Sequence, residues 1–236
     1  MQEYLLEPHV YPSVTEGGAV LLDRRRGRYF GLSLPNFERL RIVVHGDDPI
    51  VPCTEEDRHA AIRSADKLLA QGLLTRDQSR GKPISVVVIA SPDSLLVDPD
   101  ELPVIDTSLY RERFHFAVTT TNDALAQSFD FALTRIESRK ARHPKQITAA
   151  DLPQLRILVA AFMRLRPTAY TAHKYCLPDA LTMLEFLAGY DLYPLFVIGT
   201  CTEPFAAHAW AQLEDGHVLT GGEPFDLKKY TPALAI

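Results

Sequence analysis

The chain contains 236 residues, which is long enough for one large domain or two small ones with cores of their own. A hydrophobic fraction of 46% and a charged fraction of 23% are typical of a globular protein and argue against a disordered chain. The net charge of −5 gives no basic surface, so we expect neither nucleic acid nor a membrane as a partner. Three scattered cysteines, no apolar run of about 20 residues and no signal peptide predict a cytoplasmic protein without a disulfide framework.

The first 80 residues have the pattern of a small unit in which strands precede helices. Turn signals separate three short strand-like runs, at residues 5–11, 19–23 and 28–32. A helix follows from about Pro35, and Thr54 caps a second helix that Gly72 ends. This order predicts a winged-helix-like α+β domain over residues 1–80, with no catalytic constellation in it.

Residues 76–83 are polar, contain glycine and proline, and form the best candidate for a linker. We therefore expect two domains, at residues 1–80 and 81–236. After the linker, residues 84–90 form an apolar, strand-like run. Helical periodicity then predicts helices over residues 122–142 and 151–165.

A cysteine stands at the predicted start of another helix. Pro178 and Asp179 are residue types that favour the first helical turn, and apolar residues follow Cys176 at helical spacing. Unpaired N–H groups and the helix dipole lower the pKa of a thiol at such a position. Cys176 is therefore a candidate nucleophile. The alternative is that Cys176 is a small buried hydrophobe.

A histidine follows in a predicted strand. Residues 194–199 form a short apolar run, residues 205–213 form a second strand with His208, and Asp215-Gly216 is a hairpin turn. A helix-borne cysteine followed by a strand-borne histidine is the order of papain-like and transglutaminase-like thiol enzymes. His208 could instead be a satisfied core histidine. A zinc site is a further alternative, with His173, Cys176, Cys201 and His208 as ligands.

Two groups of motifs resemble the B protein of lasso-peptide biosynthesis in its fused form. In the N-terminal part these are Val20-Leu21-Leu22-Asp23 and Arg28-Tyr29-Phe30-Gly31-Leu32. In the C-terminal part they are Cys176-Leu177-Pro178-x-Ala180-Leu181, Pro204-Phe205-Ala206-Ala207-His208-Ala209-Trp210 and Tyr230-Thr231-Pro232. The resemblance implies a PqqD-like recognition element followed by a transglutaminase-like or papain-like cysteine peptidase.

The family resemblance also implies a function, a substrate and a partner. The substrate would be a precursor peptide, whose leader is cleaved from the core before an asparagine-synthetase-like, ATP-dependent macrolactam cyclase closes the ring. We expect no cofactor in this chain, which contains no GxxxxGK[ST] phosphate loop. The leader would add a strand at a sheet edge and contact a nearby helix. The residues expected to bind it are Arg28, Tyr29, Phe30, Gly31, Leu32, Leu68, Leu69 and Leu73.

The third catalytic position departs from the family pattern, which has an acidic residue on the strand after the histidine. Here that strand leads into Thr220-Gly221-Gly222-Glu223, with no aspartate. A two-residue turn at Asp215-Gly216 would place Glu223 opposite His208 and on the same face. Glu223 is therefore the first candidate to orient the imidazole, and Asp226 is the second. A Cys–His pair with a weaker orienting group is also possible, because the third member mainly fixes the tautomer.

Two other classes of function fit the same pattern. The chain could be a catalytically degenerate scaffold that binds a leader peptide, which would explain the missing aspartate. It could also be a transglutaminase-like acyl transferase or amidase that acts on a small molecule. The second alternative gives residues 1–80 no role.

Overall fold

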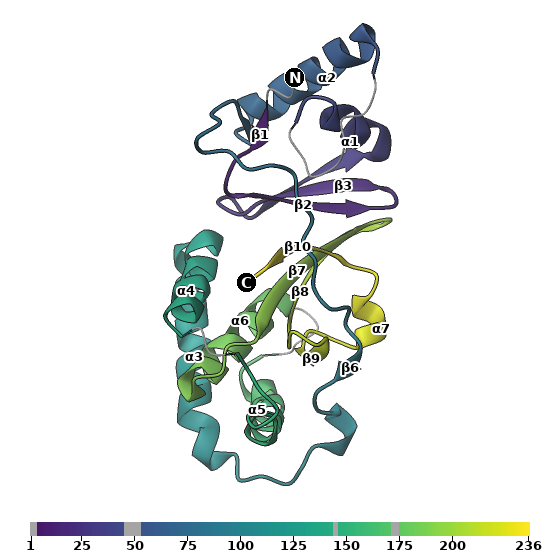
Figure 1. The fold of residues 1–236 in the computed structure, drawn as a ribbon. Coiled ribbons are helices and arrows are strands. Elements are labelled where there is room, and N and C mark those ends of the chain that lie inside the picture. The colour runs from purple at the N-terminus through teal and green to yellow at the C-terminus, as the bar shows by residue number, and fades with distance from the viewer. Residues whose placement is uncertain (1–3, 45–52, 144–145, 171–174) are drawn as a thin grey trace. The chain divides into compact units, whose positions relative to one another are not determined.

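The structure is a computed structural model that describes residues 4–44, 53–143, 146–170 and 175–236 (Figure 1). The chain forms two compact units, and its mixed α+β composition agrees with the predicted class. The first unit is Met1–Val88 with Thr200–Ala206 and Thr231–Leu234. The second is Ile89–Gly199 with Ala207–Tyr230 and Ala235–Ile236. Among the described residues, no helix is both long and apolar enough to cross a membrane.

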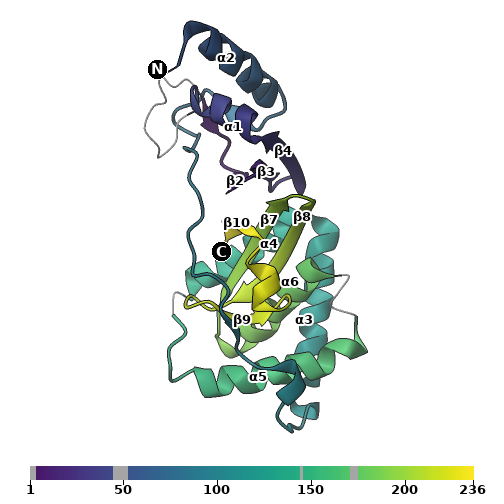
Figure 2. The ribbon, with the colours of Figure 1, turned by 90° about the vertical axis from the view of Figure 1, so that its right-hand side faces the viewer.

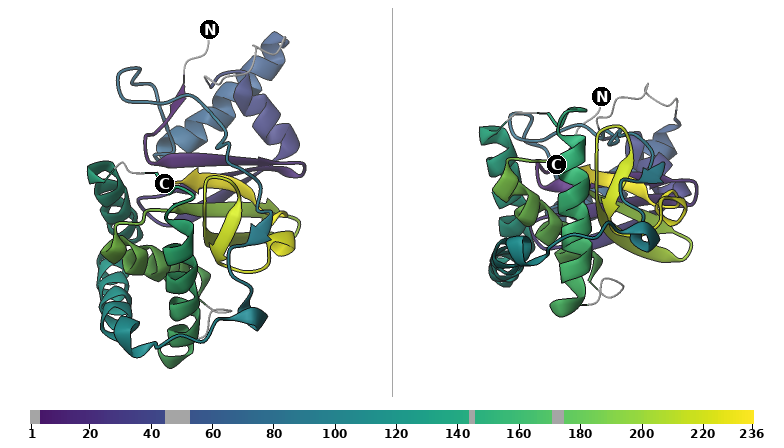
Figure 3. Two further views of the ribbon diagram at one scale, coloured as in Figure 1. Left: turned by 60° about the horizontal axis from the view of Figure 1, so that its bottom comes forward. Right: turned by 90° about the horizontal axis from the view of Figure 1, so that it is seen from below.

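The first unit has an antiparallel sheet of three strands in the order β2-β3-β4, covered by two helices (Figure 3, left). The strands are β2 (Val10–Thr15), β3 (Gly18–Asp23) and β4 (Arg28–Ser33). The helices are α1 (Leu34–Arg41) and α2 (Glu55–Ala70). A separate two-stranded pair joins β1 (Leu5–Leu6) to β5 (Leu74–Thr75). Strands precede helices as predicted, but the run expected as one strand at residues 5–11 is two strands, β1 and β2, separated by a turn, so four strands come before α1.

Helix α2 begins and ends where the sequence predicts. The hydroxyl of Thr54 accepts from the Asp57 N–H at 3.1 Å, and the Asp57 carboxylate accepts from the Thr54 N–H at 3.3 Å. This capping box satisfies two backbone donors at the helix start. Gly72 follows the helix with a φ of 72°, a conformation that glycine adopts without strain. The apolar face of α2 contributes Ala61, Ala65 and Leu68 to the core of the unit.

A five-stranded sheet has the order β10-β7-β8-β9-β6; β6, β9 and most of β7 and β8 belong to the second unit. The strands of this sheet are β6 (Ser94–Leu95), β7 (Leu195–Thr202), β8 (Phe205–Gln212), β9 (His217–Thr220) and β10 (Thr231–Ala235). Helices α3 (Ser108–Gln127), α4 (Phe129–Arg142), α5 (Leu152–Leu165) and α6 (Cys176–Leu187) gather on one side of this sheet (Figures 1 and 2). Short helical turns are η1 (Pro99–Glu101), η2 (Arg166–Thr168), η4 (Ala188–Tyr190) and α7 (Pro224–Leu227).

Two elements predicted after residue 83 are wrong. The helix expected over residues 122–142 is the end of α3 followed by α4, because Ser128 is extended and its hydroxyl accepts from the Phe131 N–H to cap α4. The strand expected over residues 84–90 forms only an isolated bridge at its start. Ile84 is buried in the core of the first unit, but Val86 and Val88 are 55% and 86% exposed, so the middle of this run neither pairs nor packs.

Helix α6 is the central helix of the second unit. It contacts α3, α4, α5 and β9, and every residue from Asp179 to Leu187 is buried. A helix held on several sides has little freedom to shift. The first residue of α6 is therefore a rigid position for a reactive group.

Candidate active site

Cys176 is the first residue of α6, as predicted. Tyr175 is the N-cap residue, and the Asp179 N–H donates to the Tyr175 carbonyl at 2.8 Å, which closes the first turn. The thiol is half-buried and accepts hydrogen bonds from the backbone N–H groups of Leu177 and Ala209. These donors and the positive end of the helix both favour a negative charge on sulfur.

His208 lies on β8, and its ring is held from two directions. Its Nε2 atom is 2.5 Å from the carbonyl oxygen of Gly221. One face of the ring stacks on Tyr230, with ring centroids 5.2 Å apart. The hydrogen bond at Nε2 leaves Nδ1 as the nitrogen that can bond the thiol, and His208 and Cys176 are hydrogen-bonded. The structure therefore brings the two predicted residues together.

The two groups shift each other's pKa toward an ion pair. Burial alone would raise the pKa of Cys176, but the hydrogen bonds from His208 and Ala209 and the charge of His208 lower it below the ordinary thiol value. Burial alone would lower the pKa of His208, but its hydrogen bonds to Cys176 and Gly221 raise it above the ordinary value. The charge of Lys229 opposes this rise. Thiolate and imidazolium therefore stabilise each other.

The third position is occupied by a backbone carbonyl. Ala211 pairs with Thr220, so the predicted register holds there, but β9 ends at Thr220. Gly221 and Gly222 then have φ values of 114° and 125°, which end the strand. Glu223 is exposed at the N-cap of α7, and Asp226 is exposed within that helix. Among the described residues no hydrogen bond joins either carboxylate to His208, and Gly221 supplies the acceptor.

Sequence reasoning missed Gly221 because a carbonyl group is present in every residue. The signal available was the Gly221-Gly222 pair itself, since adjacent glycines mark a backbone that needs unusual φ values. At Gly221 a Cβ atom would lie 2.4 Å from the Cβ of Trp210, so glycine is also required for close approach. The fully buried Trp210 packs with Val197, Val218 and Leu227 rather than offering a substrate surface.

The remaining cysteines have surroundings of their own. Cys53 is exposed, and Cys201 is half-buried with its thiol on the carbonyl of Pro204 at 3.3 Å. His173, the other expected zinc ligand, lies outside the described residues. Within the described parts of the chain, no three side chains of the metal-ligating types form a cluster that could hold an ion.

A groove of about 520 Å³ in the first unit runs between β4 and α2. Of the residues expected to bind a leader, Tyr29, Phe30, Gly31, Leu32 and Leu68 line it. Arg28 begins β4, is exposed and does not line the groove. Leu69 is half-buried against the core, and Leu73 is fully buried within it.

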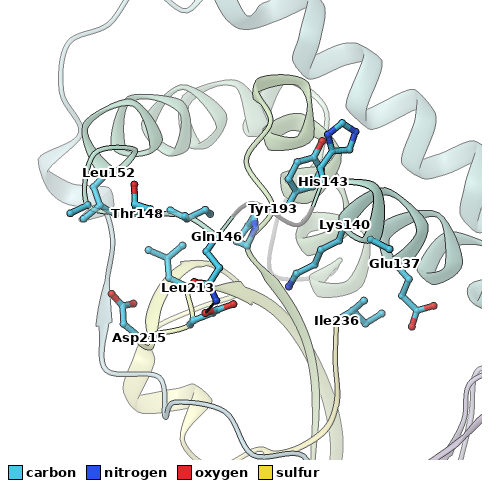
Figure 4. A pocket seen from close by; sticks show the side chains of 15 residues that line it. Glu137, Lys140, His143, Gln146, Thr148, Leu152, Tyr193, Leu213, Asp215 and Ile236 are labelled. Atoms are coloured by element: carbon cyan, nitrogen blue, oxygen red, sulfur yellow. Dashed lines mark hydrogen bonds between the residues drawn. The ribbon is translucent and has the colours of Figure 1, made fainter.

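A cavity of about 570 Å³ in the second unit does not include the Cys–His pair (Figure 4). Its lining comes from α4, the residues before and at the start of α5, the turn between β8 and β9, and Ile236. Lys140 points toward its interior, and burial lowers the pKa of this amine. The cavity is therefore separate from the candidate active site.

The geometry of the second unit agrees with a family match. The model of the transglutaminase-like superfamily matches residues 116–235, which is more than half of the 236-residue chain. The chain belongs to the transglutaminase-like superfamily. The matched region of the superfamily domain includes both Cys176 and His208. No curated protein and no solved structure matches the chain. Superfamily membership is consistent with cysteine-peptidase-like or acyl-transferase chemistry.

Proposed function

We propose that this chain is a leader peptidase of lasso-peptide maturation, with a PqqD-like recognition domain at residues 1–80 and a peptidase domain at residues 81–236. The observation that carries the proposal is the hydrogen-bonded Cys176–His208 pair at the start of a buried helix. A thiol with a lowered pKa beside an imidazole with a raised pKa is the arrangement that thiol peptidases use.

The first unit supports recognition of an extended peptide. Strand β4 pairs with β3 on one side, and no strand among the described residues pairs with its other side. An unpaired strand edge can accept a peptide as an added strand, and a groove next to it can select side chains. The groove between β4 and α2 provides such a surface, with Phe30 and Leu68 as apolar contacts and Lys67 as a charged one.

In the proposed reaction, the Cys176 thiolate attacks the carbonyl carbon of the peptide bond between leader and core. An S–C bond forms, and the Cys176 backbone N–H stabilises the oxyanion. His208 then donates its proton to the leaving amine as the C–N bond breaks. Water hydrolyses the acyl-enzyme and restores the thiol. The released core would pass to an asparagine-synthetase-like, ATP-dependent macrolactam cyclase, supplied by a separate protein.

Mass spectrometry of a precursor peptide tests the proposal. The precursor comes from the same gene neighbourhood and is incubated with wild-type protein and with Cys176→Ala. We expect loss of the leader with the wild type alone and equal leader binding by both proteins. Binding without cleavage by either protein would instead support a degenerate scaffold. Absence of both binding and cleavage would refute the proposal.

The groove has a separate test. Ser64 lines it from α2, whereas Arg63 is exposed on the same helix and does not line it. Ser64→Trp should fill the groove and raise the Kd for a labelled leader at least about tenfold, because apolar and hydrogen-bonding contacts would be lost. Arg63→Trp is the matched control and should bind as the wild type does. Equal binding by the two variants would place the leader elsewhere.

A second candidate is acyl transfer to an amine, which the superfamily match favours as strongly as hydrolysis. Both reactions pass through the same acyl-enzyme and differ only in whether water or an amine accepts the acyl group. Reaction in the presence of a primary amine distinguishes them by product mass. A product that carries the amine in place of the free acid would favour the transferase.

A further inference from the structure

A buried polar cluster in the second unit joins α6, the helix of Cys176, to the end of β9. Asp179, three residues after Cys176 in α6, is 1% exposed. Its Oδ2 accepts a short hydrogen bond from the hydroxyl of Thr220, the last residue of β9. Arg166 of η2 donates to the same oxygen at 3.3 Å. Thr220 is itself 3% exposed, so this hydrogen bond is shielded from water.

The position of Asp179 goes beyond what a helix start requires. An acidic side chain in the first turn stabilises a helix while remaining exposed, and burial of the carboxylate adds a desolvation cost. Asp179 is buried although its Oδ1 has no hydrogen-bond partner. Tyr170 interacts with Asp179 and Thr182, and burial, followed by the charge of Asp179, raises the Tyr170 pKa well above its ordinary value. A carboxylate buried at this desolvation cost calls for a role beyond the helix start.

The Asp179–Thr220 hydrogen bond links the helix of the nucleophile to the strand that supports the histidine. Thr220 immediately precedes Gly221, and the Gly221 carbonyl accepts from Nε2 of His208 at 2.5 Å. Helix α6 and β9 also contact each other (Figure 1). Gly221 and Gly222 carry no side chain that could anchor the segment after Thr220. Fixing Thr220 therefore fixes where the Gly221 carbonyl points.

We propose that Asp179 is the acidic positioning residue of this site, and that it acts through Thr220 to hold the Gly221 carbonyl against His208. The proposal rests on the proposed thiol chemistry of Cys176 and His208. It assigns to a carboxylate from the cysteine helix the orienting role that a carboxylate on the strand after the histidine has in the family pattern. Asp179 contacts neither reacting group, so it positions the catalytic residues rather than taking part in the reaction.

The sign of the expected effect follows from the charges around the pair. Without Thr220 fixed, the Gly221 carbonyl stabilises the imidazolium less, and the pKa of His208 falls. A less charged His208 stabilises the thiolate less, so the pKa of Cys176 rises. Lys229 acts on His208 in the same direction before and after the change. Arg166 and Tyr170, which interact with Asp179, are present in every variant and do not alter this expected direction.

Four single variants separate positioning from stability. Thr220→Val removes the hydroxyl with nearly the same shape, Thr220→Ser retains it, and Asp179→Asn keeps the shape of the acid without its charge. Thr121→Val is the matched control, because Thr121 is 2% exposed and its hydroxyl has no partner. The readouts are the thermal midpoint, kcat and KM for the precursor, and the pH dependence of Cys176 alkylation by iodoacetamide, located by peptide mapping.

We expect Thr220→Val, which removes the donor, to move the alkylation midpoint upward by about one pH unit, and Asp179→Asn, whose amide oxygen still accepts but carries no charge, to move it in the same direction by less. They should lower kcat by about 10- to 100-fold with KM changed less than about twofold. Thr220→Ser and Thr121→Val should behave as the wild type does. The double variant Asp179→Asn/Thr220→Val should be no worse than either single variant, because both act through one hydrogen bond.

The proposal is overturned if Thr220→Val keeps the wild-type alkylation midpoint and kcat. A lower thermal midpoint alone in Asp179→Asn would likewise assign the acid a structural role. If Asp179→Asn does not fold, the comparison of Thr220→Val with Thr220→Ser decides the question. Alkylation needs no peptide substrate, so a failure of the leader-peptidase function leaves this test intact.

Discussion

Substitution of Gly221 by alanine perturbs the carbonyl that holds His208 without changing any side chain that the site uses. Gly221 has a φ of 114°, a region that residues with a Cβ rarely adopt. The added Cβ would also lie 2.4 Å from the Cβ and 2.9 Å from the Cα of Trp210. Trp210 is fully buried, so it cannot move aside. The backbone of residue 221 must shift instead, and its carbonyl shifts with it.

The magnitude follows from two separate costs. A residue with a Cβ at this φ costs about 1–3 kcal/mol in stability. A hydrogen bond to a charged imidazolium contributes about 1.5–3 kcal/mol, and its loss lowers kcat by about 10- to 150-fold. Gly222→Ala separates these costs. Gly222 has a similar φ of 125°, but its added Cβ would meet no atom within 4 Å. It therefore carries the backbone strain without the collision.

Urea unfolding and steady-state cleavage of the precursor measure the two effects. We expect both glycine variants to lose stability, and only Gly221→Ala to lose most of its kcat and to raise the pH midpoint of Cys176 alkylation. Equal kcat values for Gly221→Ala and Gly222→Ala would refute the reasoning, because the carbonyl would then have no orienting role. A loss in both variants that follows stability alone would refute it as well.

Three further outcomes are expected. Alkylation of Cys176 should reach half of its maximum rate at a lower pH than alkylation of free cysteine, because the Cys176 pKa is lowered. Cleavage should decline again only above the ordinary pKa of histidine, because the His208 pKa is raised. Equal alkylation midpoints for Cys176 and free cysteine would contradict this. Glu223→Gln and Asp226→Asn should each change kcat less than about threefold, since both carboxylates are exposed and neither forms a hydrogen bond with His208. A tenfold loss of kcat in either variant would identify that residue as the group that orients His208. Glu185→Gln should lower the free energy of unfolding by about 2–3 kcal/mol, because the buried Glu185 carboxylate accepts from Arg139 at 2.6 Å and from Arg135 at 3.4 Å. Glu112 is exposed, so the control Glu112→Gln should change the free energy of unfolding by less than about 0.5 kcal/mol.

Local signals in the sequence predict much of the fold. The capping residue Thr54 and the terminating Gly72 set the ends of α2, and the structure confirms both. The break between α3 and α4 was not predicted, because apolar residues continue at helical spacing on both sides of Ser128. The apolar run at residues 84–90 was misread for a related reason. Periodicity reports which face is apolar, whereas pairing depends on whether a second strand is in reach.

The candidate site likewise contains features that local sequence predicts and features that depend on packing. A cysteine at a helix start and a histidine in a following strand can be recognised from sequence, because each depends on its local segment. The acceptor on His208 depends on how β9 ends, which the two glycines change and a register argument cannot follow. The sequence alone indicates only that Asp179 suits a helix start. Its contact with Thr220 joins residues 41 positions apart and becomes visible only when α6 and β9 are packed.

A carbonyl in place of a carboxylate has a consequence for the acid side of the pH profile. A carboxylate that bonds the imidazole directly adds a full charge to the ion pair and loses it on protonation, so it contributes its own titration. The Gly221 carbonyl accepts the same hydrogen bond at every pH but stabilises the imidazolium less. The acid limb of activity should therefore follow the Cys176 thiol alone. In this arrangement the carboxylate of Asp179 contacts the Thr220 hydroxyl, and not the histidine itself. Its role is to hold the backbone that bonds His208, whereas the pH dependence of activity comes from Cys176 and His208.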